Sequence, residues 1–138
     1  MEQTLMMIKP DAVERKLVGR ILERVEASGL RVAQLRMLRL RPEEARAFYR
    51  VHEGKPFLDS LVAFMSSGPI VAGVLEGENA IRRWRELMGA TDPAKAAAGT
   101  IRRDFAEGIE RNSVHGSDAP ETARDEIAFF GLGHGLRP

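Results

Sequence analysis

One histidine lies in a polar cluster whose residue types suit nucleophilic chemistry. His115 is the middle of the run Asn112–Asp118, which reads NSVHGSD. Imidazole is a competent nucleophile near neutral pH because one ring nitrogen is unprotonated, and a carboxylate on the other nitrogen fixes the tautomer. His115 is therefore the candidate nucleophile, and we expect Gly116 beside it to let a reactant approach closely.

Three cations and a hydroxyl outside this cluster could bind phosphate together. Lys9 follows an apolar run, Arg85 and Thr91 lie on either side of Gly89, and Arg102 follows Gly-Thr. Arginine grips phosphate oxygens with two parallel N–H donors and neutralises charge in phosphoryl transfer. The set fits a polyphosphate, whereas each arginine taken alone is better explained as a solvated surface residue.

Several other chemistries have no support in the sequence. The chain has no cysteine, which excludes disulfides, thiolate zinc sites and a cysteine nucleophile. It also lacks a GxxxxGK[ST] loop, a GxGxxG turn and a GxSxG elbow. No histidine pair has metal-ligand spacing and the acidic residues are scattered, so we expect no protein-held metal. A magnesium ion would then arrive on substrate phosphates.

The hydropathy pattern predicts alternating strands and helices that would position these residues. A buried strand over 4–9 delivers Lys9 at its end, and an apolar repeat over 18–25 predicts a helix that stops at Gly29. The next strand, 30–40, changes parity between Met37 and Leu38, which indicates a bulge or an exit from the sheet. A capping box of Asp118 and Glu121 is expected to start the last helix. The further predicted elements are helices over 42–52, 58–65, 78–88 and 118–130, strands over 70–75 and 113–117, a long loop over 90–112 and a loose tail over 131–138.

The predicted order of alternating strands and helices indicates an α+β sandwich of the split βαβ type, with a four-stranded antiparallel sheet under helices. The 138 residues match one ordinary domain, 43% hydrophobic content is enough for a core, and neither a repeat nor a domain boundary is visible. We therefore expect residues 1–138 to form a single domain.

Charge and hydropathy also limit the partners. The net charge of +1 favours neither nucleic acid nor an acidic membrane. No apolar run approaches the about 20 residues of a membrane span, and the N-terminus lacks the pattern of a secretory signal. The sequence predicts a cytoplasmic protein with no membrane segment and no specific nucleic-acid partner.

Several ordered blocks resemble nucleoside diphosphate kinases. NSVHGSD matches the NxxHGSD signature of that family, and the similarity extends over nearly the whole chain. The further matching blocks are MIKPD at Met7–Asp11, SGPIVAGVLEG at Ser67–Gly77, MGATDPAKAAAGTIRRDF at Met88–Phe105 and EIAFF at Glu126–Phe130. The resemblance implies a ferredoxin-like sandwich and a ping-pong transfer of the γ-phosphoryl group of a nucleoside triphosphate to a nucleoside diphosphate.

The resemblance also implies a role for each matching residue. His115 would carry the phosphoryl group on Nδ1, Glu126 would hold the other ring nitrogen, and Ser117 would support Glu126. Magnesium would accompany the nucleotide, and the chain would form a homo-oligomer, either a tetramer or a hexamer. The remaining roles concern the nucleotide: Arg85, Thr91 and Arg102 on the phosphates, Tyr49 near the γ-phosphate, Lys9 and Asn112 on the ribose 3′-hydroxyl, and Phe57 against the base with Leu61 beside it.

The chain departs from the family at Arg103, where a glycine is usual, and in its short C-terminal tail. His52 and His134 match no family role, so we interpret both as structural or surface residues. Two alternatives come from other classes. A nucleic-acid or small-molecule binding module could share the fold, but the chain has no basic-aromatic RNA-binding octamer. A silent scaffold would be expected to lack His115, Lys9 or Glu126, and all three are present.

Overall fold

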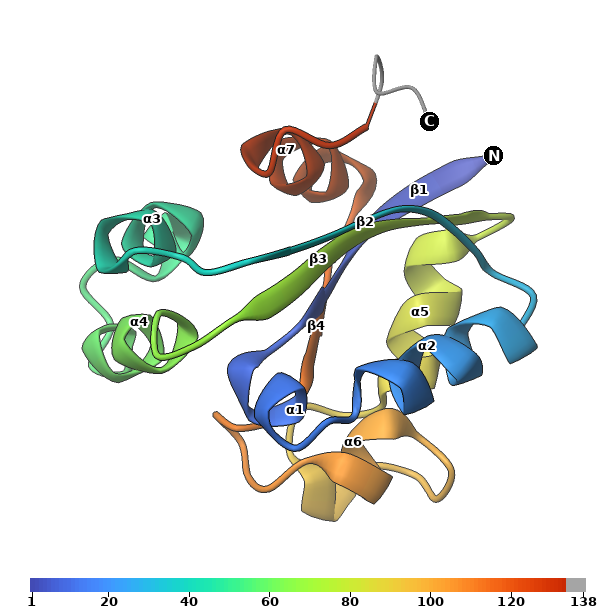
Figure 1. Ribbon diagram of the computed structural model, residues 1–138, viewed down its shortest axis with the longest axis horizontal. Helices are drawn as coiled ribbons and strands as arrows, with labels where there is room; N and C mark the ends of the chain where they lie inside the picture. The colour runs from blue at the N-terminus through green and yellow to red at the C-terminus, as the bar shows by residue number, and fades with distance from the viewer. Residues whose placement is uncertain (134–138) are drawn as a thin grey trace.

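The computed structural model describes residues 1–133, and four strands form its centre (Figure 1). The strands are β1 (Glu2–Ile8), β2 (Arg31–Leu38), β3 (Ile70–Gly77) and β4 (Val114–Gly116). Their order in the sheet is β2-β3-β1-β4, and every neighbouring pair is antiparallel. The predicted α+β class and the four-stranded antiparallel sheet are confirmed.

Helices join the strands and none of those in residues 1–133 is long and apolar enough to cross a membrane. Pro10 and Pro42 each begin a helix at its first position, where the missing N–H costs nothing. The helices are α1 (Pro10–Glu14), α2 (Val18–Ala27), α3 (Pro42–Phe48), α4 (Leu58–Met65), α5 (Ala80–Met88), α6 (Ile101–Phe105) and α7 (Pro120–Phe129), with the 3₁₀ turns η1 (Arg50–His52) and η2 (Pro93–Lys95).

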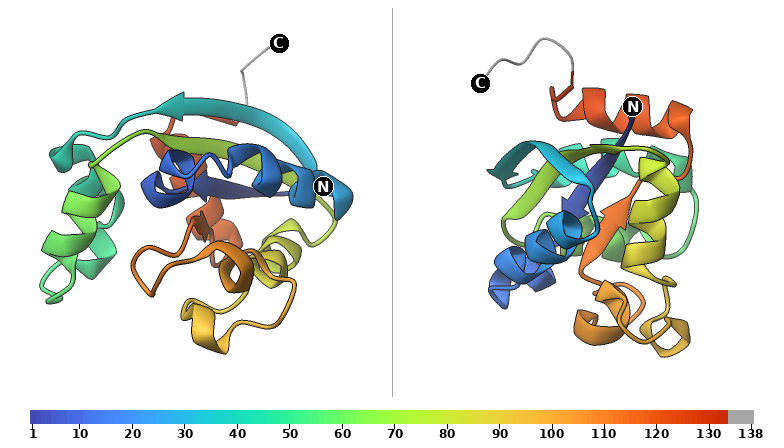
Figure 2. Two further views of the ribbon diagram at one scale, coloured as in Figure 1. Left: turned by 60° about the horizontal axis from the view of Figure 1, so that its bottom comes forward. Right: turned by 90° about the vertical axis from the view of Figure 1, so that its right-hand side faces the viewer.

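The sheet is packed on both faces, which explains why β1 and β3 read as continuous apolar runs. Leu5 and Met7 of β1 point to one face, where they contact residues of α3, α4 and α7. Met6 and Ile8 point to the other, where α1, α2, α5 and α6 pack. Figure 2 shows α7 and α2 on opposite sides of the curved sheet. The alternation of side chains along one strand thus fills two separate apolar layers.

The boundaries differ from the predictions at several points. The Pro-Asp turn after Lys9 is the short helix α1. The irregularity in β2 lies between Val32 and Gln34, and β2 leaves the sheet after Leu38, so the parity change there marks an exit and not a bulge.

Both ends of α7 also differ from the predictions. Its start is capped by the Thr122 hydroxyl, which accepts from the amides of Asp118 and Ala119, so the predicted Asp118–Glu121 capping box is wrong. The predicted loose tail is wrong for residues 131–133, because Gly133 exchanges two hydrogen bonds with the Gln34 side chain. The rest of that tail, with His134, lies outside the described residues.

Candidate active site

A cavity of about 870 Å³ opens at the ends of β1 and β4. Every predicted site residue except Ser117 lines it; these are Lys9, Tyr49, Phe57, Leu61, Arg85, Thr91, Arg102, Asn112, His115 and Glu126. A second hollow of about 730 Å³ shares Arg85 and Asp118 with this cavity but holds neither His115 nor Lys9. The larger cavity is therefore the candidate site.

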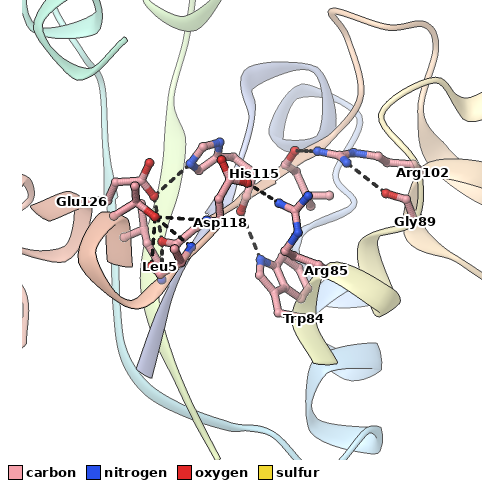
Figure 3. Close-up of polar contacts among 12 residues, drawn as sticks. Leu5, Trp84, Arg85, Gly89, Arg102, His115, Asp118 and Glu126 are labelled. Carbon is pink, nitrogen blue, oxygen red and sulfur yellow. Dashed lines mark hydrogen bonds and ion pairs between the residues drawn. The ribbon is translucent and has the colours of Figure 1, made fainter. Parts of the chain in front are cut away.

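Hydrogen bonds join His115 to Glu126 (Figure 3), and Glu126 in turn to Ser117. His115 Nε2 lies 3.1 Å from Glu126 Oε1, and the Ser117 hydroxyl donates to the same oxygen at 2.7 Å. Burial opposes ionisation of Glu126, but the bonds from His115 and Ser117 outweigh it and hold the pKa of this carboxyl below its ordinary value. An ionised Glu126 accepts Nε2–H, so the ring lone pair lies on Nδ1.

Ser117 is buried and connects the Glu126 carboxylate to the sheet through hydrogen bonds. Its oxygen also accepts from the amide of Leu5 at 3.3 Å. Glu126 belongs to α7 and His115 to β4, which pairs with β1 through Met7 and His115. The histidine and its partner are thus held by separate elements that meet only in the folded chain.

Trp84 supports His115 from the opposite side of β4 and was not found by sequence reasoning. Its indole N–H donates to the His115 carbonyl at 3.2 Å (Figure 3). A Cβ on Gly116 would lie 2.5 Å from Trp84 and 2.7 Å from Met88. Gly116 is therefore needed to admit the indole ring. It also lines the cavity, and its expected role in letting a reactant approach stays a prediction.

Aromatic rings form the wall beside the histidine. Phe48 lies edge-on to His115 with ring centres 5.4 Å apart, and Tyr49 lies edge-on at 6.2 Å. The Tyr49 hydroxyl is buried with no hydrogen-bond partner within residues 1–133, and burial together with the nearby Glu126 charge raises its pKa. A protonated phenol at the cavity wall is a donor for an anionic ligand.

Lys9 and Asn112 are hydrogen-bonded to each other in the lining of the cavity. Lys9 Nζ donates to Asn112 Oδ1 at 2.8 Å, and both residues are buried. Burial and the charge of Arg102 lower the pKa of Lys9 to about 8, against the opposing charges of Asp11 and Glu110. The sequence places these residues 103 positions apart, and the pairing of β1 with β4 brings them together.

The two arginines expected at the phosphates are already hydrogen-bonded. Arg85 pairs with Asp118 at the cavity edge, where both are exposed. Arg102 donates to the carbonyls of Gly89 and Val114 at 3.0 and 2.9 Å (Figure 3). Burial and the charge of Arg85 lower the pKa of Arg102 to about 10, which still leaves it cationic at neutral pH. The site therefore presents two guanidinium groups that lie close enough to influence each other.

The outer part of the cavity is apolar. Phe57 is 46% exposed at its mouth, and Leu61 lies one helical turn further along α4. His52, interpreted from the sequence as a structural or surface residue, lines this cavity between Phe57 and Tyr49, with ring centres 5.1 and 6.2 Å away. The helix predicted over 42–52 is interrupted in the structure, where α3 ends at Phe48 and the 3₁₀ turn η1 follows. The hydropathy pattern therefore did not predict where the His52 ring lies.

Among residues 1–133 there is no group of three or more His, Asp or Glu side chains that could hold a metal ion. Two acids of the cavity are engaged, Glu126 by His115 and Asp118 by Arg85. The cationic donors of the cavity fit phosphate oxygens.

Comparison with known proteins identifies the family. The family model described as nucleoside diphosphate kinase matches residues 2–132. The chain belongs to the nucleoside diphosphate kinase family. A nucleoside diphosphate kinase of Halorhodospira halophila is 60% identical over 129 residues, which cover 94% of this chain and 92% of the relative. The family name describes a phosphotransferase, and this chain is an enzyme of that class.

Solved nucleoside diphosphate kinases have the same fold. The Aquifex aeolicus enzyme superposes with a TM-score of 0.91 at 48% identity, covering 94% of both chains. A halophilic enzyme from Halobacterium salinarum, solved in complex with CDP, gives 0.90 at 46% identity and covers 94% of this chain and 86% of its own. The ferredoxin-like fold predicted for this nucleoside diphosphate kinase is confirmed.

Arg103, which replaces the usual glycine of the family, does not line the cavity. Its guanidinium donates to the Ala94 carbonyl of η2 at 3.3 Å, whereas Arg102 on the same helix turns inward. In this nucleoside diphosphate kinase the extra cation joins two short helices of the loop over 90–112.

Proposed function

We propose that this enzyme transfers the γ-phosphoryl group of a nucleoside triphosphate to a nucleoside diphosphate by a ping-pong mechanism through a phosphohistidine on His115. The observation that carries the proposal is the bond between His115 Nε2 and Glu126, because it leaves the lone pair on Nδ1 in a cavity lined by cations. One active domain over residues 1–138 is part of this proposal.

In the first half-reaction the Nδ1 lone pair attacks the γ-phosphorus. The bond from that phosphorus to the bridging oxygen breaks, and the nucleoside diphosphate leaves with the electron pair. Glu126 stabilises the positive charge that develops on the ring, while Arg85, Arg102, Thr91 and Tyr49 face the phosphate oxygens. In the second half-reaction a terminal oxygen of another diphosphate attacks the same phosphorus, and the phosphorus–nitrogen bond breaks.

We assign the nucleoside to the rest of the cavity. Lys9 and Asn112, which we call the ribose pair, bond the 3′-hydroxyl, and the base stacks on Phe57 beside Leu61. The exposed ring at the cavity mouth favours this assignment because stacking accepts any base, as an enzyme acting on several nucleotides requires. The CDP bound to the halobacterial relative is consistent with a nucleotide ligand here.

Magnesium is expected as part of the nucleotide substrate. The ion neutralises phosphate charge when it is bound to the triphosphate. The cationic lining of the cavity, in which Glu126 and Asp118 are already engaged by His115 and Arg85, supports delivery of Mg²⁺ on the phosphates. The cytoplasmic location and the homo-oligomer implied by the resemblance stay predictions.

The decisive experiment incubates the protein with γ-labelled ATP and Mg²⁺ without an acceptor. We expect an acid-labile, alkali-stable label on the chain, which leaves when GDP is added. His115→Ala, checked by circular dichroism to be folded, should take up no label and show no turnover. Transfer activity that survives in this variant would overturn the mechanism, and a folded wild-type chain without label would favour a binding module or scaffold.

A further inference from the structure

We infer that the hydrogen bond between Asp11 and Ser113 positions the ribose pair, so that Asp11 and Ser113 are positioning residues for phosphoryl transfer. The inference rests on the proposed function and assigns a role to two residues that make no contact with the cavity. Both side chains are completely buried.

Ser113 lies in a backbone conformation that disfavours a side chain. Its φ is +74°, in the left-handed region where glycine is usual. Asn112 precedes it directly and β4, with His115, begins directly after it. The strained residue therefore joins one member of the ribose pair to the nucleophile strand, and strain of this kind persists where surrounding contacts hold it.

The side chain of Ser113 supplies those contacts. Its hydroxyl donates to Asp11 Oδ2 at 3.2 Å and accepts from Arg15 at 3.5 Å. In addition, the backbone carbonyl of Ser113 accepts a hydrogen bond from the Lys9 amide at 2.9 Å. Glycine at this position would remove the backbone strain but would also remove the hydroxyl. Serine therefore retains the hydrogen bond to Asp11 although its backbone conformation is strained.

Asp11 adds charge to this arrangement. It lies in the first turn of α1, two residues after Lys9, and its Oδ2 is 3.5 Å from Arg15. Its Oδ1 has no hydrogen-bond partner in the described part of the chain, so the polar contacts of this buried carboxylate are those of Oδ2 with Ser113 and Arg15. The groups that act on the Lys9 ammonium are Asp11, Glu110 and Arg102, together with the neutral amide of Asn112. The carboxylate thus favours the charged lysine that donates to Asn112.

The first test compares a natural acceptor, GDP, with 3′-deoxy-GDP, which lacks the hydroxyl that the ribose pair would bond. For Ser113→Gly and Asp11→Asn we expect kcat/KM with GDP to fall by about 10- to 100-fold, as for residues that orient a reacting group. With 3′-deoxy-GDP the same variants should differ from wild type by less than about 2-fold, because there is no hydroxyl to misplace.

Lys16→Gly is the matched control. Lys16 also has a positive φ, +62°, but it is exposed between α1 and α2. This variant relieves backbone strain without touching the ribose pair, so its kcat/KM should equal that of wild type with both acceptors. Ser113→Ala, which keeps the strain and loses only the hydroxyl, replaces Asp11→Asn if that variant does not fold.

The second test uses pH. Deprotonation of Lys9 should give kcat/KM for GDP a falling limb near pH 8. Removal of the negative charge of Asp11 lowers the pKa of Lys9, so in Asp11→Asn the limb should move to lower pH. Ser113→Gly retains that charge and should keep the limb in place.

The outcomes separate the inference from the function on which it rests. Equal losses with GDP and 3′-deoxy-GDP, or no loss at all, would overturn the positioning role while the enzyme remains active. A wild-type enzyme that uses both acceptors equally well would overturn the ribose assignment and the inference with it. Absence of any transfer by wild type would instead contradict the proposed function.

Discussion

His115 depends on its carboxylate partner for orientation and tautomer. In Glu126→Gln the amide retains the shape of the carboxylate but loses its charge. The variant therefore no longer favours the tautomer with the lone pair on Nδ1, and it no longer stabilises the positive charge that the ring acquires in the transition state. We expect kcat to fall by about 10- to 100-fold. Nitrogen NMR of the imidazole should show a larger share of the Nδ1–H form, and an unchanged spectrum with reduced kcat would contradict this explanation.

Phe57 offers an exposed ring to the base. Phe57→Ala should weaken nucleotide binding by about 1–3 kcal/mol, the range measured for stacking of a base on an aromatic ring. Titration calorimetry with ADP measures the loss, and inorganic triphosphate, which has no base, is the control ligand. A similar loss for both ligands would place the base elsewhere in the cavity.

At the level of elements, the contact between β4 and α5 sets where His115 lies. Gly116→Ala would put a methyl group 2.5 Å from the buried Trp84 ring, and overpacking of this kind costs about 1–3 kcal/mol. Urea unfolding should show this loss, with reduced turnover because the His115 carbonyl is bonded to the same indole.

Gly108→Ala is the control for this variant. A Cβ there would meet no atom of the described residues within 4 Å, so stability should change little. Equal stability of Gly116→Ala and wild type would mean that the two elements can separate without cost.

Local sequence patterns were sufficient to predict the helix α2 but not the start of α7. The apolar repeat of α2 and the stop at Gly29, which has φ +91°, follow from rules that act over one or two turns. The capping of α7 by Thr122 was missed because Asp118, the expected cap, instead pairs with Arg85 on a different helix. A long-range ion pair replaced the expected local hydrogen bonds of the cap, and no local pattern encodes that ion pair.

For the whole molecule, the resemblance implies a homo-oligomer. β2 is an edge strand of the sheet and exposes Leu35 and Met37, which a monomer would leave in water. Sedimentation equilibrium should give the mass of four or six chains. A single species of 15.3 kDa at micromolar concentration would contradict this prediction.

The sequence by itself determined the fold class and the family, because periodic apolar residues and contiguous motifs such as NSVHGSD are local properties of the chain. It also indicated which residue types could act on phosphate. The resemblance implied that His115 meets Glu126 and that Lys9 and Asn112 act together, but only the tertiary structure decided the geometry of these contacts and placed Gly116 against Trp84. The physical reason is that these contacts join distant segments through the pairing of β1 with β4 and the packing of helices on both faces of the sheet, and hydropathy patterns carry no record of such neighbours.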